Sequence, residues 1–158
     1  MQEFRQYFFR SSGVQTLPVL IDLHLITNID FMSTDSFTFQ NIKAWQKSHS
    51  FVLLVYNITQ AFPKEEIFGL TSQFRRAAVS IEANIAEGYK KLSKNDKLRF
   101  FNIAEGSIEE CRDYIILSFD LEYITKQQYE MLVASIEEAS KLLNAYSRGI
   151  INNNAIKD

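Results

Sequence analysis

Cysteine, histidine, glycine and proline are scarce in this chain of 158 residues, which has one Cys, two His, five Gly and two Pro. The single cysteine, Cys111, excludes an internal disulfide framework and a cysteine-based zinc cluster. No Glu-x-x-His pair is present, so the usual ligands of a diiron helical bundle are absent. The isolated glycines form no phosphate-binding loop. The sequence therefore predicts a protein without catalytic residues, cofactor or metal.

The charge and hydropathy of the chain indicate a cytoplasmic protein with no membrane partner. A formal charge of −2 gives no whole-chain attraction to nucleic acid or to anionic membrane, so such binding needs a local patch. Polar residues and Pro18 interrupt every apolar run in the first 31 residues, which disfavours a signal peptide or a membrane span. We expect residues 1–36 to be a loosely ordered extension, or a misplaced start upstream of Met32.

Hydrophobic periodicity predicts four helices between residues 37 and 150. Apolar residues recur there at spacings of three and four, which place them on one face of a helix. Pro63 ends the first helix and Gly88 is expected to stop the second, while Ser93 and Thr125 are suited to cap the third and fourth. The four stripes are Ile42, Trp45, His49, Val52, Tyr56 and Thr59; Leu70, Phe74, Ala77, Ile81 and Ile85; Phe101, Ala104, Ile108, Cys111 and Ile115; and Tyr129, Leu132, Ile136, Leu143, Tyr146 and Ile150.

These four stripes predict an all-α fold, because long helices with short connections bury them most simply in an antiparallel up-down-up-down four-helix bundle. No strand pattern competes with this arrangement. We expect the bundle over residues 37–150 and a frayed tail over residues 151–158.

Three of the helices carry a second row of apolar or small residues away from the expected core stripe. In the first helix this row contains Phe51, Leu54 and Ile58. Soluble monomers rarely expose so much contiguous apolar surface, so we predict a homo-oligomer. The alternative is that the N-terminal extension covers the surface within one chain. The expected interface residues of the second and third helices are Val79, Ala83, Ala86, Phe100, Ile103 and Tyr114.

A basic turn is predicted between the second and third helices, where residues 88–99 read GYKKLSKNDKLR. Four lysines and one arginine stand there against one acid, Asp96. Repetition of this turn in an oligomer would create a multivalent site for a polyanion. The alternative is a merely solvated turn. Tyr89 is suited either to stack on an unpaired base or to pack on its own helix end.

The segment FGLTSQFRRAAVSIEANIAEGYKK, residues 68–91, resembles the hallmark segment of the bacterial four-helix bundle proteins encoded within 23S ribosomal RNA intervening sequences. NIKAWQKSHSFVLLVYNITQAFPKEEIFGL and RFFNIAEGSIEECRDYIILSFDLEYI resemble other parts of the same family, so the resemblance covers about residues 37–148. It implies a non-catalytic bundle that assembles as a ring, most often a pentamer.

The family also resembles the accessory variability determinant proteins of diversity-generating retroelements. A basic surface of those proteins is associated with nucleic acid, either RNA or DNA, and with a reverse transcriptase. The resemblance therefore implies these partners beside the chain itself. The candidate nucleic-acid-binding residues are Arg75, Arg76, Lys90, Lys91, Lys94, Lys97 and Arg99.

Two departures from the family pattern bear on these expectations. Glu82 stands where many members have proline, so the second helix should be straighter. Lys90 and Lys91 stand where members often have Gly-Arg, which keeps charge but loses bidentate phosphate geometry. The leading hypothesis is a homo-oligomeric bundle that binds structured RNA through repeated basic turns. The alternative is a protein-interaction scaffold without a nucleic-acid role.

Overall fold

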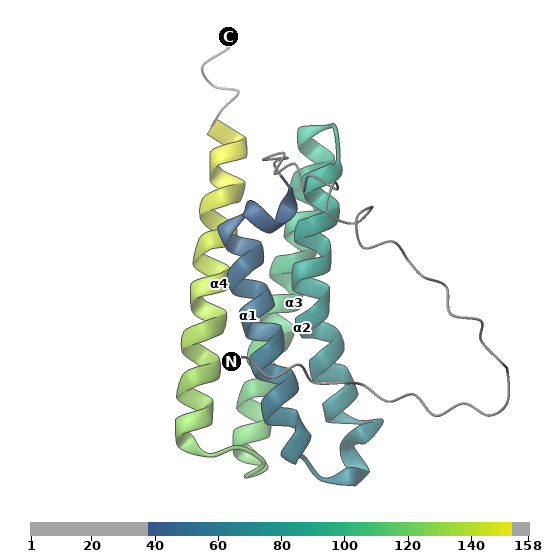
Figure 1. The fold of residues 1–158 in the computed structure, drawn as a ribbon, viewed down its shortest axis with the longest axis vertical. Coiled ribbons are helices and arrows are strands. Elements are labelled where there is room, and N and C mark those ends of the chain that lie inside the picture. Colours follow the sequence, from purple (N-terminus) through teal and green to yellow (C-terminus); the bar gives the residue numbers. More distant parts are fainter. Residues whose placement is uncertain (1–37, 153–158) are drawn as a thin grey trace, which may run out of the picture. The chain divides into compact units, whose positions relative to one another are not determined.

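The computed structural model describes residues 38–152, which form an antiparallel up-down-up-down bundle (Figure 1). Consecutive helices contact each other, and α4 packs back against α1. This confirms the predicted all-α fold. The predicted extension over residues 1–36 lies outside the described residues, as do residues 153–158 of the predicted tail. The elements are η2 (Phe39–Asn41), α1 (Lys43–Ile58), η3 (Thr59–Ala61), η4 (Lys64–Ile67), α2 (Leu70–Lys90), α3 (Lys94–Asp120) and α4 (Lys126–Asn152), where η marks a short 3₁₀ helix.

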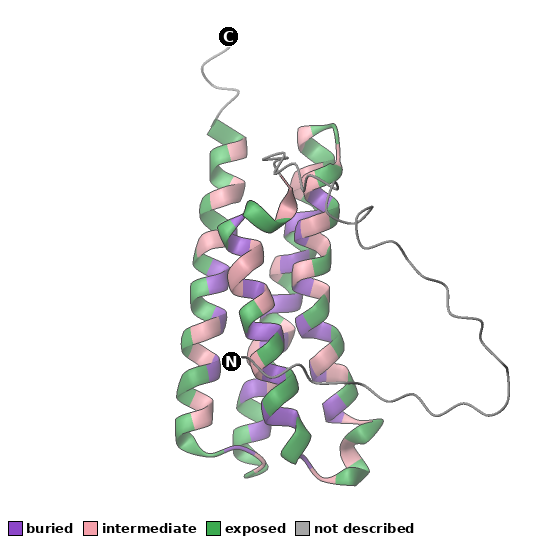
Figure 2. Cartoon of the chain, in the orientation of Figure 1, coloured by how far each residue is buried: buried purple, intermediate pink, exposed green. Residues whose placement is uncertain are grey.

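The core runs along the inner faces of all four helices (Figure 2). The predicted stripes of α2 and α3 are confirmed, because each of their residues is buried. In α4, Leu132, Ile136 and Leu143 are buried, whereas Tyr129 and Tyr146 are partly buried at the edge. Residues 151 and 152, which were expected to belong to the frayed tail, are helical and form the end of α4.

The predicted core stripe of α1 is correct for Ile42, Val52 and Thr59, which are buried, but wrong for Trp45, His49 and Tyr56. Tyr56 is 41% exposed and Trp45 and His49 are half-buried, whereas Phe51 and Ile58 are buried. The rings of Trp45 and His49 stack with centroids 5.0 Å apart, and His49 Nδ1 lies 2.8 Å from Glu82 Oε2 at the edge between α1 and α2. Rings that carry both apolar faces and polar atoms are more stable at this edge than in the core, because their polar atoms can form hydrogen bonds there. Phe51 and Ile58 therefore belong to the core and not to a second face.

Gly88 does not stop α2, contrary to the sequence prediction, because the helix continues through it to Lys90. The residue is buried where α2 and α3 approach each other closely. A Cβ atom at this position would lie 2.5 Å from Phe101 Cε1 and 3.1 Å from the Cβ of Phe100. The glycine is thus explained by the space that the neighbouring helix leaves, and not by a left-handed cap.

Side-chain caps fix the starts of α2, α3 and α4. The backbone N–H of Leu70 donates to Glu66 Oε2 at 2.8 Å, and that of Asp96 donates to Ser93 Oγ at 3.1 Å. Thr125 Oγ1 accepts a bond from the N–H of Gln128, whose side chain accepts one from the N–H of Thr125, a reciprocal capping box. The predicted caps at Ser93 and Thr125 are confirmed.

Candidate nucleic-acid interface

The basic turn is a connection of only three residues between α2 and α3. Lys91 leaves the helix in an extended conformation, and Ser93 caps α3 immediately afterwards. Leu92 stands at the apex of the turn with its side chain 99% exposed. The short connection brings all five cations of residues 88–99 to one end of the bundle, at the top in Figure 1.

Two lysines of this cluster bind carbonyl oxygens at the ends of helices. Lys97 Nζ donates to the backbone oxygen of Tyr89 at 2.6 Å, near the end of α2. Lys94 Nζ donates to the backbone oxygen of Ile151 at 2.9 Å, near the end of α4. The last carbonyl groups of a helix lack a hydrogen-bond donor within the helix and carry partial negative charge. A lysine ammonium there supplies both a donor and a compensating positive charge. Lys94 and Lys97 therefore hold two helix ends to the start of α3.

The remaining cations of the turn differ in how far their charges are paired within the chain and how far they are exposed. Lys91 Nζ pairs with Glu87 Oε1 at 3.0 Å and lies 4.5 Å from the centroid of the Phe100 ring. The guanidinium of Arg99 also lies over this ring, at 4.9 Å. Lys90 and Arg99 are exposed, whereas Lys91 is half-buried. Glu87 lies just outside the segment counted from the sequence and neutralises part of its charge, so Lys90 and Arg99 are the cations best placed to contact a polyanion.

Of the two roles expected for Tyr89 from the sequence, the structure favours packing on its own helix end over stacking on a base. Its side chain is partly buried against the hydrophobic core, and the Nζ of Lys97 lies 5.8 Å from its ring centroid. The ring thus packs on the end of its own helix, which favours structural packing over base stacking.

Arg75 and Arg76 lie near the other end of α2. Fifteen positions separate Arg75 from Lys90, which corresponds to about 22 Å along a helix. Arg75 Nε donates to Thr59 Oγ1 at 2.8 Å, and its guanidinium lies 4.8 Å from the centroid of the Tyr56 ring. Arg76 is exposed and donates to Gln73 Oε1 at 2.7 Å. The seven predicted cations therefore form two separate groups.

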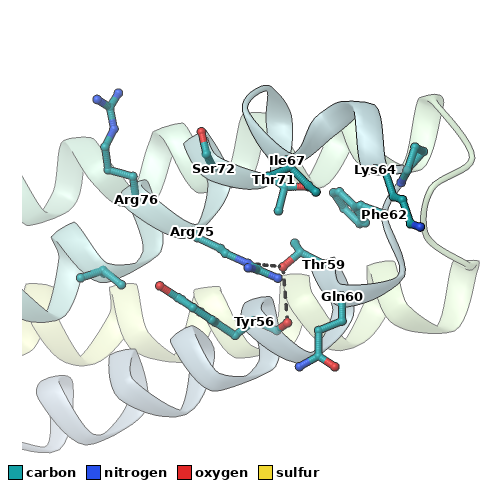
Figure 3. A pocket seen from close by; sticks show the side chains of 12 residues that line it. Tyr56, Thr59, Gln60, Phe62, Lys64, Ile67, Thr71, Ser72, Arg75 and Arg76 are labelled. Carbon is teal, nitrogen blue, oxygen red and sulfur yellow. Dashed lines mark hydrogen bonds between the residues drawn. The ribbon is translucent and has the colours of Figure 1, made fainter.

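Arg75 and Arg76 line a groove of about 660 Å³ between the end of α1 and the start of α2 (Figure 3). Arg75 points along the groove toward Thr59, and Arg76 points away toward solvent. This groove was missed by sequence analysis because it is assembled from α1, η3, η4 and α2. Its lining residues, which include three cations and no acid, are Tyr56, Thr59, Gln60, Phe62, Pro63, Lys64, Ile67, Thr71, Ser72, Arg75, Arg76 and Val79.

The residues predicted to form a subunit interface differ in how much surface they offer. Val79 and Ile103 are 36% and 43% exposed, and Ala83 is exposed as well. Ala86 and Tyr114 are half-buried. Phe100 is only 9% exposed, because Gly88 and the cations above its ring enclose it within one chain. Phe100 therefore contributes little to a surface on which a neighbouring subunit could pack.

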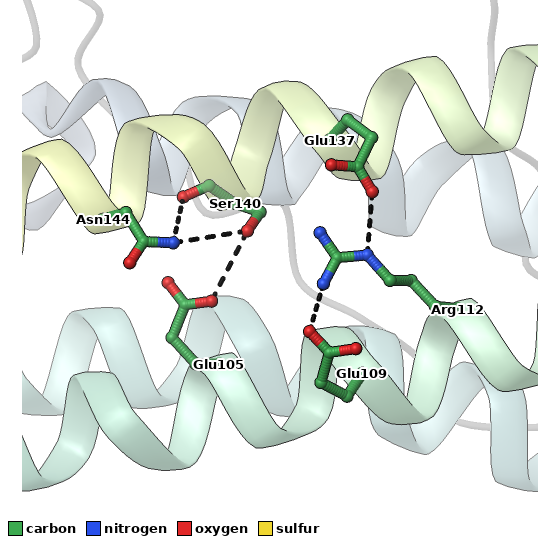
Figure 4. Close-up of polar contacts among 6 residues, drawn as sticks. All are labelled: Glu105, Glu109, Arg112, Glu137, Ser140 and Asn144. Carbon is green, nitrogen blue, oxygen red and sulfur yellow. Dashed lines mark hydrogen bonds and ion pairs between the residues drawn. The ribbon is translucent and has the colours of Figure 1, made fainter.

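Two acidic residues of α3, Glu105 and Glu109, take part in the polar contacts between α3 and α4 (Figure 4). Arg112 Nε donates to Glu137 Oε1 at 2.8 Å, Arg112 also pairs with Glu109, and the bond to Glu137 raises the pKa of the guanidinium. Glu105 Oε2 accepts a bond of 3.5 Å from Ser140 Oγ, and burial raises the pKa of this carboxyl group. Within residues 38–152, no three His, Cys, Asp or Glu side chains gather so as to hold a metal ion.

Cys111 is completely buried in the core of the bundle. Burial strongly raises the pKa of its thiol, with a smaller contribution in the same direction from Glu110. The thiolate is the reactive form of cysteine, so this residue acts as a small core side chain. In the part of the chain that the structure describes, no helix has the length and apolarity needed to cross a membrane.

Comparisons with known proteins place this geometry in a family. The family described as 23S rRNA-intervening sequence protein matches residues 40–145. A crystal structure of a protein of unknown function from the S23 ribosomal protein family of Bacteroides thetaiotaomicron is 30% identical and superposes with a TM-score of 0.61, over 66% of this chain and 97% of that one. No curated protein matches the chain. The chain belongs to the 23S rRNA-intervening sequence protein family.

Proposed function

We propose that the chain forms a non-catalytic homo-oligomer, a pentamer by family resemblance, that binds structured RNA through the basic turn of each subunit. The observation that carries this proposal is the gathering of five cations at one end of the bundle, with Lys90 and Arg99 exposed. The name of the family, which refers to an intervening sequence of ribosomal RNA, supports RNA over DNA. Repetition of a modest patch in every subunit raises the affinity for a polyanion that spans several of them.

The roles within the turn are unequal under this proposal. Lys90 and Arg99 contact phosphates directly, since both are exposed. Lys94 and Lys97 add positive potential but hold helix carbonyls, so their first role is in folding. Arg75 and Arg76 are too distant to share a short phosphate contact with the turn of the same subunit.

A protein-interaction scaffold is the second candidate function. The observation that favours it is the engagement of Lys94 and Lys97 with the carbonyl oxygens of Ile151 and Tyr89, which explains both lysines without a ligand. On this alternative, Leu92 at the apex of the turn is an anchor for a protein partner. A reverse transcriptase is such a partner if the gene belongs to a retroelement.

The experiment that separates the two functions measures binding to a structured RNA by fluorescence anisotropy across a salt series. A Lys90→Ala/Arg99→Ala variant should bind more weakly, and its salt dependence should fall by about one unit of slope for each phosphate that the variant no longer neutralises. The matched control is Lys126→Ala/Lys141→Ala, which removes the same charge from exposed positions of α4 and should bind as the wild type does.

Two outcomes would count against the proposal. No binding of the wild-type chain at low salt would favour the scaffold. Equal losses of affinity in the turn variant and in the α4 control would show that net charge, and not the turn, governs binding. A Lys94→Ala/Lys97→Ala variant tests the structural role, because it should lower the thermal unfolding midpoint more than the Lys90→Ala/Arg99→Ala variant does.

A further inference from the structure

The groove between α1 and α2 has a composition that folding of one chain does not explain. Lys64, Arg75 and Arg76 line it together with apolar side chains, and no acid is among its lining residues. Ile67 is 51% exposed and Val79 is 36% exposed at this surface. Basic and apolar groups together suit a partner that offers carboxylates beside an apolar side chain.

Thr71, in the wall of the groove, supplies a second observation. Its side chain is 6% exposed, yet its hydroxyl oxygen has no hydrogen-bond partner among the described residues. A buried hydroxyl without a partner costs free energy, so such groups are rare. The wall of the groove thus contains a buried hydroxyl group without a partner, and two of the lining cations, Lys64 and Arg76, are exposed.

A surface of opposite character lies on α3 of the same chain. Asp113, Ile116, Leu117 and Asp120 are spaced as i, i+3, i+4 and i+7, which places them on one face of the helix. All four are exposed, and Ile116 and Leu117 are 51% and 40% exposed. We call these four residues the α3 ridge. Their pattern, two apolar anchors between two acids, is that of a helix that docks into a groove.

The acid at the end of the ridge is not explained by stability of the helix. Asp120 is the last residue of α3, where the partial negative charge of the helix end disfavours a carboxylate. Its neighbour Leu121 is also exposed, at 44%. An acid and apolar residues in this position fit a contact outside the chain better than a contact within it.

The groove and the α3 ridge lie in the same half of the bundle. The rings of Phe74 in α2 and Tyr114 in α3 are 5.8 Å apart, and Tyr123 donates to Glu66 at 3.3 Å beside the groove. The two surfaces are nevertheless different parts of the chain. A contact between them in two copies is therefore heterologous, and such contacts close into rings when the rotation permits.

We propose that the groove of one subunit receives the α3 ridge of a second copy of this chain. Ile116 and Leu117 of the neighbour pack on the apolar wall, and its Asp113 and Asp120 face Lys64 and Arg76. Arg75 stays bound to Thr59 and supports the wall. The row of Val79, Ala83 and Ala86 continues from the groove along α2 and extends the contact. This inference rests on the proposed self-association and adds which two surfaces meet.

Charge reversal tests the pairing without requiring a loss of folding. Lys64→Glu/Arg76→Glu makes the groove acidic, and Asp113→Lys/Asp120→Lys makes the ridge basic. Each variant should raise the dissociation constant of the assembly by at least about tenfold, because like charges then face each other across the contact. The quadruple variant carries both reversals and should assemble as the wild type does. Sedimentation velocity over a range of concentrations measures assembly, and circular dichroism checks that every variant is folded.

Matched controls on α4 reverse the same number of charges. They are Lys126→Glu/Lys141→Glu and Glu130→Lys/Glu138→Lys, all at exposed positions. Assembly that both double variants retain, or that the quadruple variant fails to recover, overturns the pairing of groove and ridge. Equal losses of assembly in the α4 controls overturn it too. A monomeric wild type refutes self-association itself, whereas an assembling wild type with unaffected double variants refutes only this inference.

Discussion

Replacement of Gly88 by alanine tests whether α2 and α3 approach each other as closely as the structure shows. The added methyl group would lie 2.5 Å from Cε1 and 3.0 Å from Cδ1 of the Phe101 ring. That ring is 1% exposed and packs against Tyr146 with centroids 5.4 Å apart, so it has little room to move. Overpacking of a core typically costs about 1–3 kcal/mol. Removal of a glycine from a helix interior returns about 0.8–1 kcal/mol.

The net effect of Gly88→Ala should be a loss of up to about 2 kcal/mol in the free energy of unfolding, or a fall of up to about 8 °C in the thermal midpoint. Gly106→Ala is the matched control, because it lies within α3 and a Cβ there meets nothing within 4 Å. This control should gain about 0.5–1 kcal/mol, so the two substitutions should have opposite signs. Urea denaturation measures both.

A Gly88→Ala variant as stable as the Gly106→Ala variant would refute the close approach. A second test uses Phe101→Leu, which removes the ring edge nearest to the new methyl group. Combined with Gly88→Ala, it should destabilise the protein by less than the sum of the two single changes, a coupling that a double-mutant cycle reveals. Strict additivity would mean that the methyl group and the ring do not meet.

Two further predictions concern titratable groups of α3. Burial raises the pKa of Glu105, whose Oε1 has no partner among the described residues, so the native state holds this proton to higher pH than the unfolded chain does. The free energy of unfolding should therefore fall as pH rises from the ordinary glutamate range through the raised pKa, and Glu105→Gln should remove that fall in urea titrations. A difference between variant and wild type that is constant with pH would contradict this. Cys111 should react with iodoacetamide only as fast as the bundle unfolds, because its buried thiol has a raised pKa. Rapid labelling of the folded protein would contradict its burial.

The sequence predicted the bundle well where its stripes consist of purely apolar side chains. Phe74, Ile81 and Ile85 have no competing environment, so their spacing alone places the inner face of α2. In α1 the spacing is right for Ile42, Val52 and Thr59 but wrong for Trp45 and His49, because these rings stack on each other at the helix edge, where His49 reaches Glu82. Gly88 is ambiguous for another reason: a glycine suits a cap and a close helix approach equally, and only the neighbouring helix decides.

The candidate site could also be predicted only in part from the sequence. Sequence alone locates the basic turn, because its lysines are close together with few acids between them. It cannot show that Lys94 binds the carbonyl oxygen of Ile151, which lies 57 positions away. The groove is equally hidden, since Thr59, Lys64 and Arg76 come together only when η3 and η4 fold against α2. Tertiary contacts thus decide which charges are free.

The groove and the basic turn lie at opposite ends of α2, and this placement links assembly to RNA binding. If the groove and the α3 ridge join the subunits into a ring, rotation places every basic turn on the same side of it. A single RNA then contacts several turns at once. The ring should therefore bind this RNA more tightly than one subunit does, by more than the ratio of their charges alone would predict. Loss of assembly should therefore weaken RNA binding even when the turn is intact.

The Asp113→Lys/Asp120→Lys variant tests this link by the sign of its effect. Each substitution replaces a negative charge by a positive one, so electrostatics alone predicts tighter binding to RNA. Loss of multivalency predicts weaker binding, because a free subunit offers one turn instead of several. Anisotropy titrations at one salt concentration measure which effect is larger, with the Glu130→Lys/Glu138→Lys variant, which is expected to assemble, as the control of equal charge. Weaker binding of the ridge variant than of this control supports a ring with its turns on one side. Equal binding by the two variants would mean that each basic turn acts alone.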